Sequence, residues 1–403
     1  MSTRRSRGIA LACCYASMVA LAGGVNLIPV LLTTLGVECG GANGLTNEQL
    51  GRIGAVVFAG LVVGILINGP LADRMGPRLF AGVGNLLMGA GLWLLAAAHS
   101  YAGVLAAAAV IGMGCGTVDM VMSPIVCALQ PERRTAAMNW LHSFYCSGAV
   151  LTVLAGAAAL RWGFAWRHLA LLLALPPIVL AVAFVVLPLP RLVPATVARD
   201  RLRDLVRRPF FLAALAAIFL AGACELGMAQ WLPAYAENAL HLSKWISGIG
   251  LMGFSIGMAA GRIAIGMAGG RMNPWALLIG SAAATAACYV GACATPWPAF
   301  AFTACVASGI AVSCLWPTLL AAVGDQFPRG GASMFGMLSG CGNLGGIIMP
   351  WLIGAIADLS SLAWGLSTGI ACALALATLL RWMRRHSAAD SGEMQQVAQP
   401  TPS

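Results

Sequence analysis

Charged side chains are scarce in this sequence: 9% of the 403 residues are Asp, Glu, Lys or Arg, whereas 60% are hydrophobic. A soluble globular chain carries about 25% charged residues, so this composition excludes a soluble globular protein. Polar stretches long enough to form a separate soluble domain are also missing between the apolar ones. With a mean hydropathy of +0.86, the composition predicts a protein that is embedded in a lipid bilayer.

Motifs for metal binding and covalent chemistry are also missing. The thirteen cysteines include no CxxC pair, and almost all of them lie in apolar stretches, which is typical of buried structural thiols. A nucleophile motif, a metal cluster and a signalling domain are absent from the sequence as well. The sequence therefore argues against a membrane enzyme or a sensor, and we expect no cofactor and no metal site.

Apolar stretches recur from one end of the chain to the other, with short polar breaks between them. A helix needs about 20 residues to cross a hydrocarbon layer of roughly 30 Å. The first stretch follows a basic start but is too long for a signal peptide, so we expect it to stay in the protein as the first membrane-spanning helix. The sequence predicts twelve membrane-spanning helices at residues 8–35, 49–69, 79–98, 102–129, 137–159, 168–187, 209–236, 245–267, 275–293, 299–323, 334–357 and 363–384.

Basic residues indicate the orientation, because arginines at the ends of spans are retained on the cytoplasmic side. With the amino terminus in the cytoplasm, nineteen of the 23 basic residues fall on that side, Arg262 among them. The formal charge of +10 then reflects topology and attraction to anionic membrane lipids, and it needs no nucleic-acid partner. We predict an integral protein of a bacterial cytoplasmic (inner) membrane with both termini cytoplasmic.

The second half of the chain repeats the first. PIVCALQPE aligns with PTLLAAVGD, so Pro124 corresponds to Pro317 and Glu132 to Asp325. Two six-helix halves of this kind form a solute site at their interface and rock around it. We predict an all-α membrane protein with pseudo-symmetric six-helix halves at residues 1–188 and 209–386, a cytoplasmic linker at 189–208 and a disordered cytoplasmic tail at 387–403.

The loop after the second predicted span reads GPLADRMGPR. Gly69 and Gly76 allow a tight turn between two helices. Asp73 can accept hydrogen bonds from helix N-termini across the boundary between the halves. Arg74 and Arg78 can pair with acids or lipid phosphates. A degenerate copy without the aspartate, GRIAIGMAGGRM, follows the eighth predicted span. Only the first half is therefore expected to carry the full set of loop residues, the aspartate included.

This loop resembles the signature loop of the major facilitator superfamily of transporters. The resemblance implies the major facilitator fold, with twelve spans in two halves, and a monomer as the functional unit. It also implies that the five loop residues form a conformational latch. That latch comprises Gly69, Asp73, Arg74, Gly76 and Arg78.

Other segments resemble the fucose:proton symporter family within that superfamily. GMGCGTVDMVMSP and MNWLHSFYCSGA put Asp119, Asn139 and His142 on motif positions. LWPTLL is similar to that family's Phe-Pro-Thr segment, with Trp316 in place of phenylalanine. Asn26 stands in the first span, where fucose-type members carry an aspartate. The resemblance implies that the partners are protons and a small polar solute, most simply a sugar.

Asp119 lies in a stretch that is otherwise apolar or small. An ionised carboxylate near the middle of a membrane costs roughly 3 kcal/mol on insertion scales. No arginine or lysine is expected near the middle of any span, so Asp119 must face a cavity, find a polar partner or stay protonated. Its small neighbours, including Gly112 and Gly116, leave room for a ligand or for a close-packed helix. We predict that Asp119 carries the coupling proton; a structural aspartate is the alternative.

Glu225 is the second acid within a span, and we predict a role in coupling or solute binding; a satisfied structural acid is the alternative. His142 shares a helix face with Asn139 and Tyr145, at spacings of three residues, so the fifth span presents a polar stripe. Hydrogen-bonding residues, with tryptophans that can stack on a sugar ring, complete the predicted site. The predicted solute-binding residues are Asn26, Asn139, His142, Gln230, Trp231, Trp316 and Asn343, with Ser339 as a further hydrogen-bonding candidate.

A proton-driven efflux antiporter for drugs or metabolites is the alternative function within the same superfamily. Such an exporter is expected to carry Gly-x3-Gly-Pro-x2-Gly-Gly in its fifth span. The fifth span here reads SGAVLTVLAGAAAL and has no proline. The sequence therefore favours a secondary transporter that imports a small polar solute with protons by alternating access.

Overall fold

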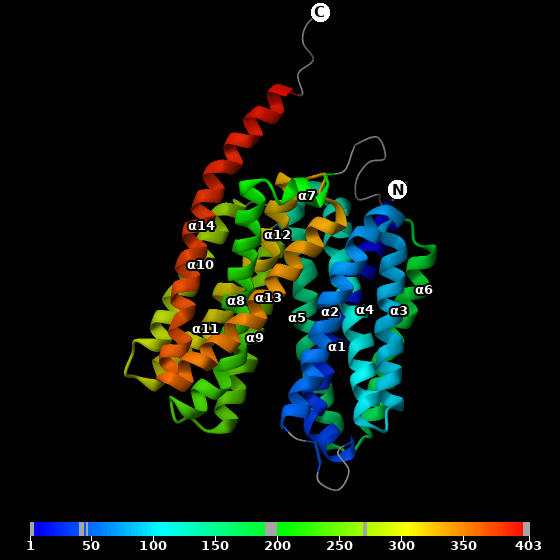
Figure 1. Cartoon of the computed structure of the whole chain (residues 1–403), viewed down its shortest axis with the longest axis vertical. Coiled ribbons are helices and arrows are strands. Elements are labelled where there is room, and N and C mark those ends of the chain that lie inside the picture. The colour runs from blue at the N-terminus through cyan, green and yellow to red at the C-terminus, as the bar shows by residue number, and fades with distance from the viewer. Residues whose placement is uncertain (1–3, 40–43, 46, 190–199, 269–271, 398–403) are drawn as a thin grey trace, which may run out of the picture. The chain divides into compact units, whose positions relative to one another are not determined.

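The computed structural model of the chain describes residues 4–39, 44–45, 47–189, 200–268 and 272–397. All regular secondary structure in these ranges is helical (Figure 1). The helices of the first half of the chain are α1 (Arg4–Cys39), α2 (Asn47–Met75), α3 (Pro77–Ala97), α4 (Tyr101–Leu129), the 3₁₀ turn η2 (Pro131–Arg133), α5 (Arg134–Arg161) and α6 (Trp166–Val186). The remaining helices are α7 (Leu202–Leu205), α8 (Pro209–Asn238), α9 (Lys244–Ala268), α10 (Pro274–Cys293), α11 (Pro298–Val312), α12 (Leu315–Gln326), α13 (Gly331–Leu359) and α14 (Leu362–Val397).

Local sequence sets several helix boundaries. Ser100 begins α4 by accepting a hydrogen bond from the Gly103 amide, and Asn273 does the same for the Ala276 amide of α10. A single residue, Gly76, separates α2 from α3, and its φ of 94° is one that glycine adopts without strain. The tight turn predicted at Gly76 is therefore confirmed.

Membrane-spanning helices account for most of the chain. Within the described residues, eleven helical segments are long and apolar enough to cross a membrane, with α11 and α12 together forming one of them. The predicted span 137–159 is also helical, as α5, although its described part is less apolar because it carries the polar stripe. The predicted span 299–323 differs from expectation, because it is interrupted between Val312 and Leu315.

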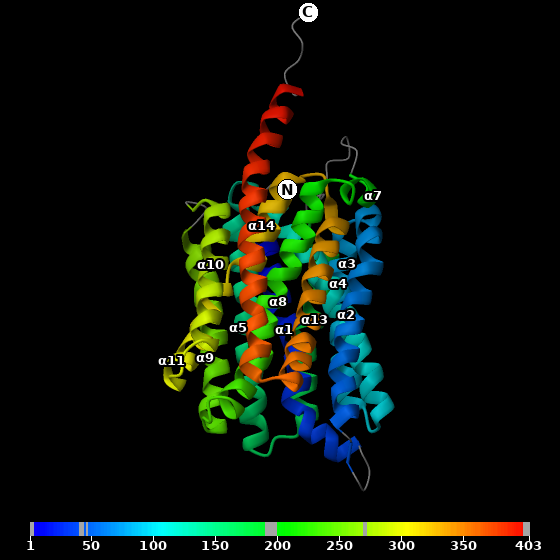
Figure 2. The same cartoon turned by 60° about the vertical axis from the view of Figure 1, so that its left-hand side comes forward.

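The helices form two compact units, and each is described by itself. Unit 1 comprises Met1–Asp200 and Arg329–Gly340, and unit 2 comprises Arg201–Pro328 and Cys341–Ser403. In unit 1, α4 packs on α2 and α3, while α3 packs on α6 and α1 on α5. In unit 2, α10 packs on α11 and α14, and α8 packs on α14 (Figure 2). The first turns of α13 thus belong with the helices of the first repeat.

Glycines on α4 permit a very close approach to α2. A Cβ atom on Gly112 or Gly116 would overlap the carbonyl oxygen of Val57 or Leu61, respectively. Small residues at helix interfaces allow such backbone contact in membranes. Of the two interpretations offered for the small neighbours of Asp119, the structure therefore supports a close-packed helix at these two glycines.

The carboxyl-terminal segment differs from expectation. Residues 387–403 are predicted as a disordered tail, but α14 continues as a helix to Val397. Residues 387–397 contain no proline and include alanine, glutamate, methionine and glutamine, which are good helix formers. Figure 1 shows this end of α14, in red, extending past the other helices of unit 2.

The close approach of α4 and α2 predicts that Gly116→Ala destabilises the protein. The added methyl group forces the Leu61 carbonyl to move, and overpacking of this kind costs ~1–3 kcal/mol. Gly54→Ala in α2 is the matched control, because a Cβ there meets no atom within 4 Å. Thermal unfolding in detergent is expected to show a lower midpoint for Gly116→Ala than for the unchanged chain. The midpoint of Gly54→Ala is expected not to be lowered. Equal midpoints would contradict the packing.

Candidate functional site

Asp73 caps the amino-terminal turn of α13. Its Oδ1 accepts a hydrogen bond from the Ala332 amide at 2.7 Å, and its Oδ2 accepts from the Ser333 amide at 2.9 Å and from the Ser333 hydroxyl. Gly331 precedes them at a φ of 65°. The negative carboxylate thus faces the positive end of the helix dipole, and the predicted acceptance from a helix N-terminus is confirmed.

Gly69 and Arg78 lie differently from expectation. Gly69 is inside α2 rather than in a turn, because α2 continues to Met75 despite Pro70. A Cβ on Gly69 would lie 3.3 Å from Sδ of Met120 and at an ordinary contact distance, 3.5 Å, from the Cα of Ser333, so the approach of α13 does not require glycine at this position. Arg78 donates from Nε to the carbonyl of Phe184 at the end of α6, and Arg74 is exposed.

Asp119 lies half-buried on α4 and is hydrogen-bonded to a hydroxyl group. Ser339, a buried residue of α13, donates its hydrogen bond to the Asp119 carboxylate. Among the described residues, Asp119 has no cationic partner. Of the three alternatives given for Asp119, the described residues show a polar partner, and that partner is Ser339, which sequence analysis offered only as a hydrogen-bonding candidate.

Asn26 and Asn139, two other candidates of unit 1, donate hydrogen bonds within their own helices. The amide nitrogen of Asn26 donates to the Ala22 carbonyl, and that of Asn139 donates to the Thr135 carbonyl, both at 2.9 Å. Asn139 and His142 are buried, at 0% and 6% exposure. Sequence reasoning missed a further pair, in which Asn68 donates to the Thr117 hydroxyl at 2.7 Å.

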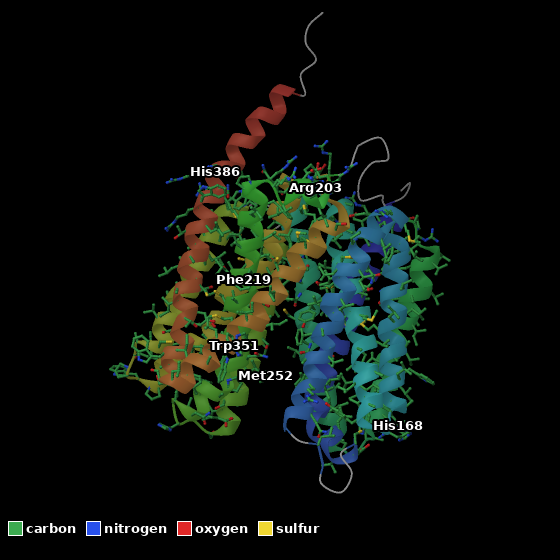
Figure 3. The ribbon with its side chains drawn as sticks, in the orientation of Figure 1. His168, Arg203, Phe219, Met252, Trp351 and His386 are labelled. Carbon is green, nitrogen blue, oxygen red and sulfur yellow. The ribbon has the colours of Figure 1, made fainter. Side chains whose placement is uncertain are left out.

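The candidates of unit 2 differ in exposure. Gln230 is exposed, and Asn343 and Trp231 are half-buried. The indole nitrogen of Trp231 donates to the carbonyl of Pro350 at 2.9 Å, so its polar group serves packing between α8 and α13. The same two helices meet at Phe219, labelled on α8 in Figure 3, whose carbonyl a Cβ on Gly345 would overlap.

Glu225 has a cationic partner, which sequence analysis did not identify. Nη2 of Arg262 donates to both carboxylate oxygens of Glu225, at 3.0 and 2.9 Å. The two side chains are only 13% and 3% exposed. Of the two roles weighed for Glu225, this contact favours the structural acid whose charge is satisfied by a partner. Arg262 lies on α9, and its side chain is buried and contacts α8.

Sequence analysis also missed an ion pair between α1 and α6. Glu38 accepts hydrogen bonds from Arg167 and from the Trp166 indole nitrogen. The hydrogen bond from Arg167 lowers the pKa of Glu38. This carboxylate lies beyond the membrane-spanning part of α1. Because its pKa is lowered, Glu38 stays ionised and paired with Arg167 to a lower pH than a free glutamate would.

Two compact units of apolar helices, with carboxylates inside their spans, define the class of secondary transporters. The model of the Major Facilitator Superfamily matches this chain at residues 9–291 and 247–402. The chain therefore belongs to the Major Facilitator Superfamily. It is an integral membrane transporter of small solutes and not an enzyme.

Two curated relatives carry names of transporters for aromatic acids. The chain is 26% identical over 385 residues to the gentisate transporter of Corynebacterium glutamicum, covering 87% of this chain and 83% of that protein. It is 31% identical over 169 residues to the 4-hydroxybenzoate transporter PcaK of Pseudomonas aeruginosa, a match that covers 41% of this chain and 37% of that protein.

Solved structures of similar fold include two sugar symporters. The E. coli fucose:proton symporter FucP aligns with a TM-score of 0.77 at 17% identity, covering 94% of this chain and 99% of that chain. The proton:xylose symporter XylE aligns with a TM-score of 0.79 at 12% identity, covering 93% and 95%. At these identities the likeness establishes the major facilitator fold.

The cap on α13 predicts that Asp73→Asn slows transport more than it weakens solute affinity. An asparagine keeps one acceptor oxygen but loses the charge and the second acceptor, and hydrogen bonds to charged groups contribute ~1.5–3 kcal/mol. Turnover in proteoliposomes is expected to fall about tenfold, with the dissociation constant changed by less than about twofold. Asp204→Asn, at an exposed acid of α7, is the control. Unchanged turnover with weakened binding would contradict the prediction.

Proposed function

We propose that this chain is a proton-coupled symporter that imports a small uncharged polar solute, with a sugar as the first candidate class. The observation that carries the proposal is the environment of Asp119. Its partner in the described part of the chain is the hydroxyl of Ser339 and not a cation. A hydroxyl group stabilises a carboxylate less than a positive charge does, so the ionised form depends on contact with water.

The same helix supports a link between this carboxylate and conformation. Ser339 and Ser333 both lie on α13, and they contact Asp119 and Asp73, respectively. Protonation of Asp119 replaces a charged acceptor by a neutral carboxyl group and weakens its hydrogen bond to Ser339. In the proposed cycle, water reaches Asp119 from one side of the membrane at a time, and proton binding changes how firmly α13 is held.

The charges of the described residues support an uncharged solute. Arg262 is the only charged side chain among those that are buried in the described part of the chain, and it is bound to Glu225. A carboxylate solute needs a cation to compensate its desolvation. A sugar needs hydrogen-bonding groups and an aromatic surface instead. We propose that Asn26, Asn139, His142, Gln230, Trp231, Trp316 and Asn343 supply these.

A second candidate solute is a hydroxybenzoate-type acid. The similarity to the gentisate transporter extends over 87% of this chain, which favours this class. Binding of such an anion requires a positive charge, so Arg262 would have to leave Glu225 when the solute enters. A sugar would leave the ion pair between Arg262 and Glu225 intact, whereas a hydroxybenzoate-type acid would require that it open.

We further propose the cytoplasmic membrane of a bacterium as the location, with both termini in the cytoplasm. The distribution of arginines along the chain supports this orientation. The exposed arginines near the end of α14, Arg381, Arg384 and Arg385, then face anionic lipid headgroups. The protein functions as a monomer in this proposal.

A ligand panel tests the solute class. Purified protein is mixed with L-fucose, D-xylose, gentisate or 4-hydroxybenzoate, and thermal unfolding is followed. A bound solute raises the midpoint by mass action, by about 2.7 kcal/mol at a hundredfold excess over its dissociation constant. A sugar is expected to raise the midpoint. A response to the two acids alone would assign the second candidate class.

A substitution at Asp119 tests the coupling. Asparagine keeps the volume and fixes the neutral state, so Asp119→Asn is expected to retain solute exchange in counterflow and to lose accumulation driven by a pH gradient. Both are measured in the same proteoliposomes, with Glu132→Gln, at an exposed acid of unit 1, as the control. A variant that still concentrates the solute would show that Asp119 is structural.

A further inference from the structure

The tenth predicted span breaks at a position that Pro317 explains. In a continuous helix the carbonyl of Ser313 accepts from the amide four residues later, but residue 317 is a proline and has no N–H. The helix α11 ends at Val312, and α12 begins at Leu315. The corresponding proline of the first repeat, Pro124, lies inside the unbroken helix α4.

Neighbouring helices satisfy the carbonyl groups that the break releases. Nε of Arg262, on α9, donates to the carbonyl of Ser313 at 2.8 Å. The hydroxyl of Ser281, on α10, donates to the carbonyl of Ala311. The guanidinium of Arg262 therefore binds the broken backbone with one nitrogen and the Glu225 carboxylate with another. Discontinuous helices in transporters commonly offer such carbonyls to a coupling cation, and here a side chain of the protein supplies the cation.

The same face of α8 contacts the residue that follows the break. Gly222 and Glu225 are three residues apart and so lie on one face of the helix. A Cβ on Gly222 would lie 3.2 Å from the Trp316 ring, and one on Gly342 would overlap that ring. The segment from Ser313 to Trp316 is thus fixed at its backbone by Arg262 and at its indole by two glycines.

We propose that Arg262 is a positioning residue that sets the place of Trp316 for solute binding, and that Glu225 serves as its counter-charge rather than as a proton carrier. The proposal rests on the proposed function, because it takes Trp316 as a solute contact. A guanidinium suits the task, since its planar group donates in several fixed directions at once. Lysine at this position keeps the charge for Glu225 but has no second nitrogen placed for the Ser313 carbonyl.

The test uses three variants of the full chain: Arg262→Lys, Glu225→Gln, and the double variant Glu225→Gln with Arg262→Gln. A single neutralisation leaves a buried charge without its partner and is expected to lower the thermal midpoint strongly, whereas removing both charges restores much of it. Arg381→Lys, at an exposed arginine of α14 in the same unit, is the matched control. The double variant keeps the test informative if Glu225→Gln does not fold.

Binding of L-fucose and D-xylose is measured for each variant that folds, and counterflow and accumulation are measured at saturating sugar. We expect Arg262→Lys to keep a midpoint close to that of the unchanged chain but to bind sugar about tenfold more weakly, which corresponds to one lost hydrogen bond. The double variant is expected to bind as weakly and still to accumulate sugar under a pH gradient. The control is expected to bind as the unchanged chain does.

Unaltered sugar affinity in both Arg262→Lys and the double variant would overturn the positioning role. A double variant that exchanges sugar but fails to accumulate it would overturn the assignment of Glu225 and make that residue a proton carrier. If the unchanged chain binds neither sugar, it is the proposed solute class that fails, and this outcome is distinct from the other two.

Discussion

A charge inside a hydrocarbon layer must be neutralised by a partner or by a proton, and this constraint shapes both units of the protein. Among the described residues, Asp119 in unit 1 and Glu225 in unit 2 are acids that lie well inside candidate spans, and their partners differ. Glu225 in unit 2 has a guanidinium at 2.9 Å, so its charge is compensated in this structure. Asp119 in unit 1 has the hydroxyl of Ser339, so its charge depends on water and protons. The acid without a cation is the one suited to coupling.

Helix α13 connects the chemistry of unit 1 to its conformation. Asp73 accepts three hydrogen bonds from its first turn, and Asp119 accepts one from Ser339 two turns later. Both acids come from the first repeat, whereas α13 belongs to the second repeat by sequence. In the proposed cycle, a change in the charge of Asp119 acts on the helix that Asp73 caps.

The sequence predicts those features that follow from composition and local chemistry. Hydropathy predicts the spans, Gly76 predicts the turn that it forms, and Asp73 predicts a helix cap. The sequence does not predict features that depend on which side chains of neighbouring helices come into contact. Arg262 lies towards the end of a span, and only the packing of α9 on α8 brings its guanidinium to Glu225. Likewise, Pro317 indicates an irregularity, but which group satisfies the Ser313 carbonyl depends on the neighbouring helices.

Proton uptake on solute binding tests the central account most directly. If Asp119 is the coupling carboxylate, a symported sugar binds its protonated form more tightly, so by linkage sugar binding draws protons from solution. L-fucose or D-xylose is added to purified protein in weakly buffered detergent solution with a pH indicator. The account predicts uptake of up to about one proton per protein, and none in Asp119→Asn. Absence of uptake in the unchanged chain when sugar binds, or equal uptake in the variant, would contradict it.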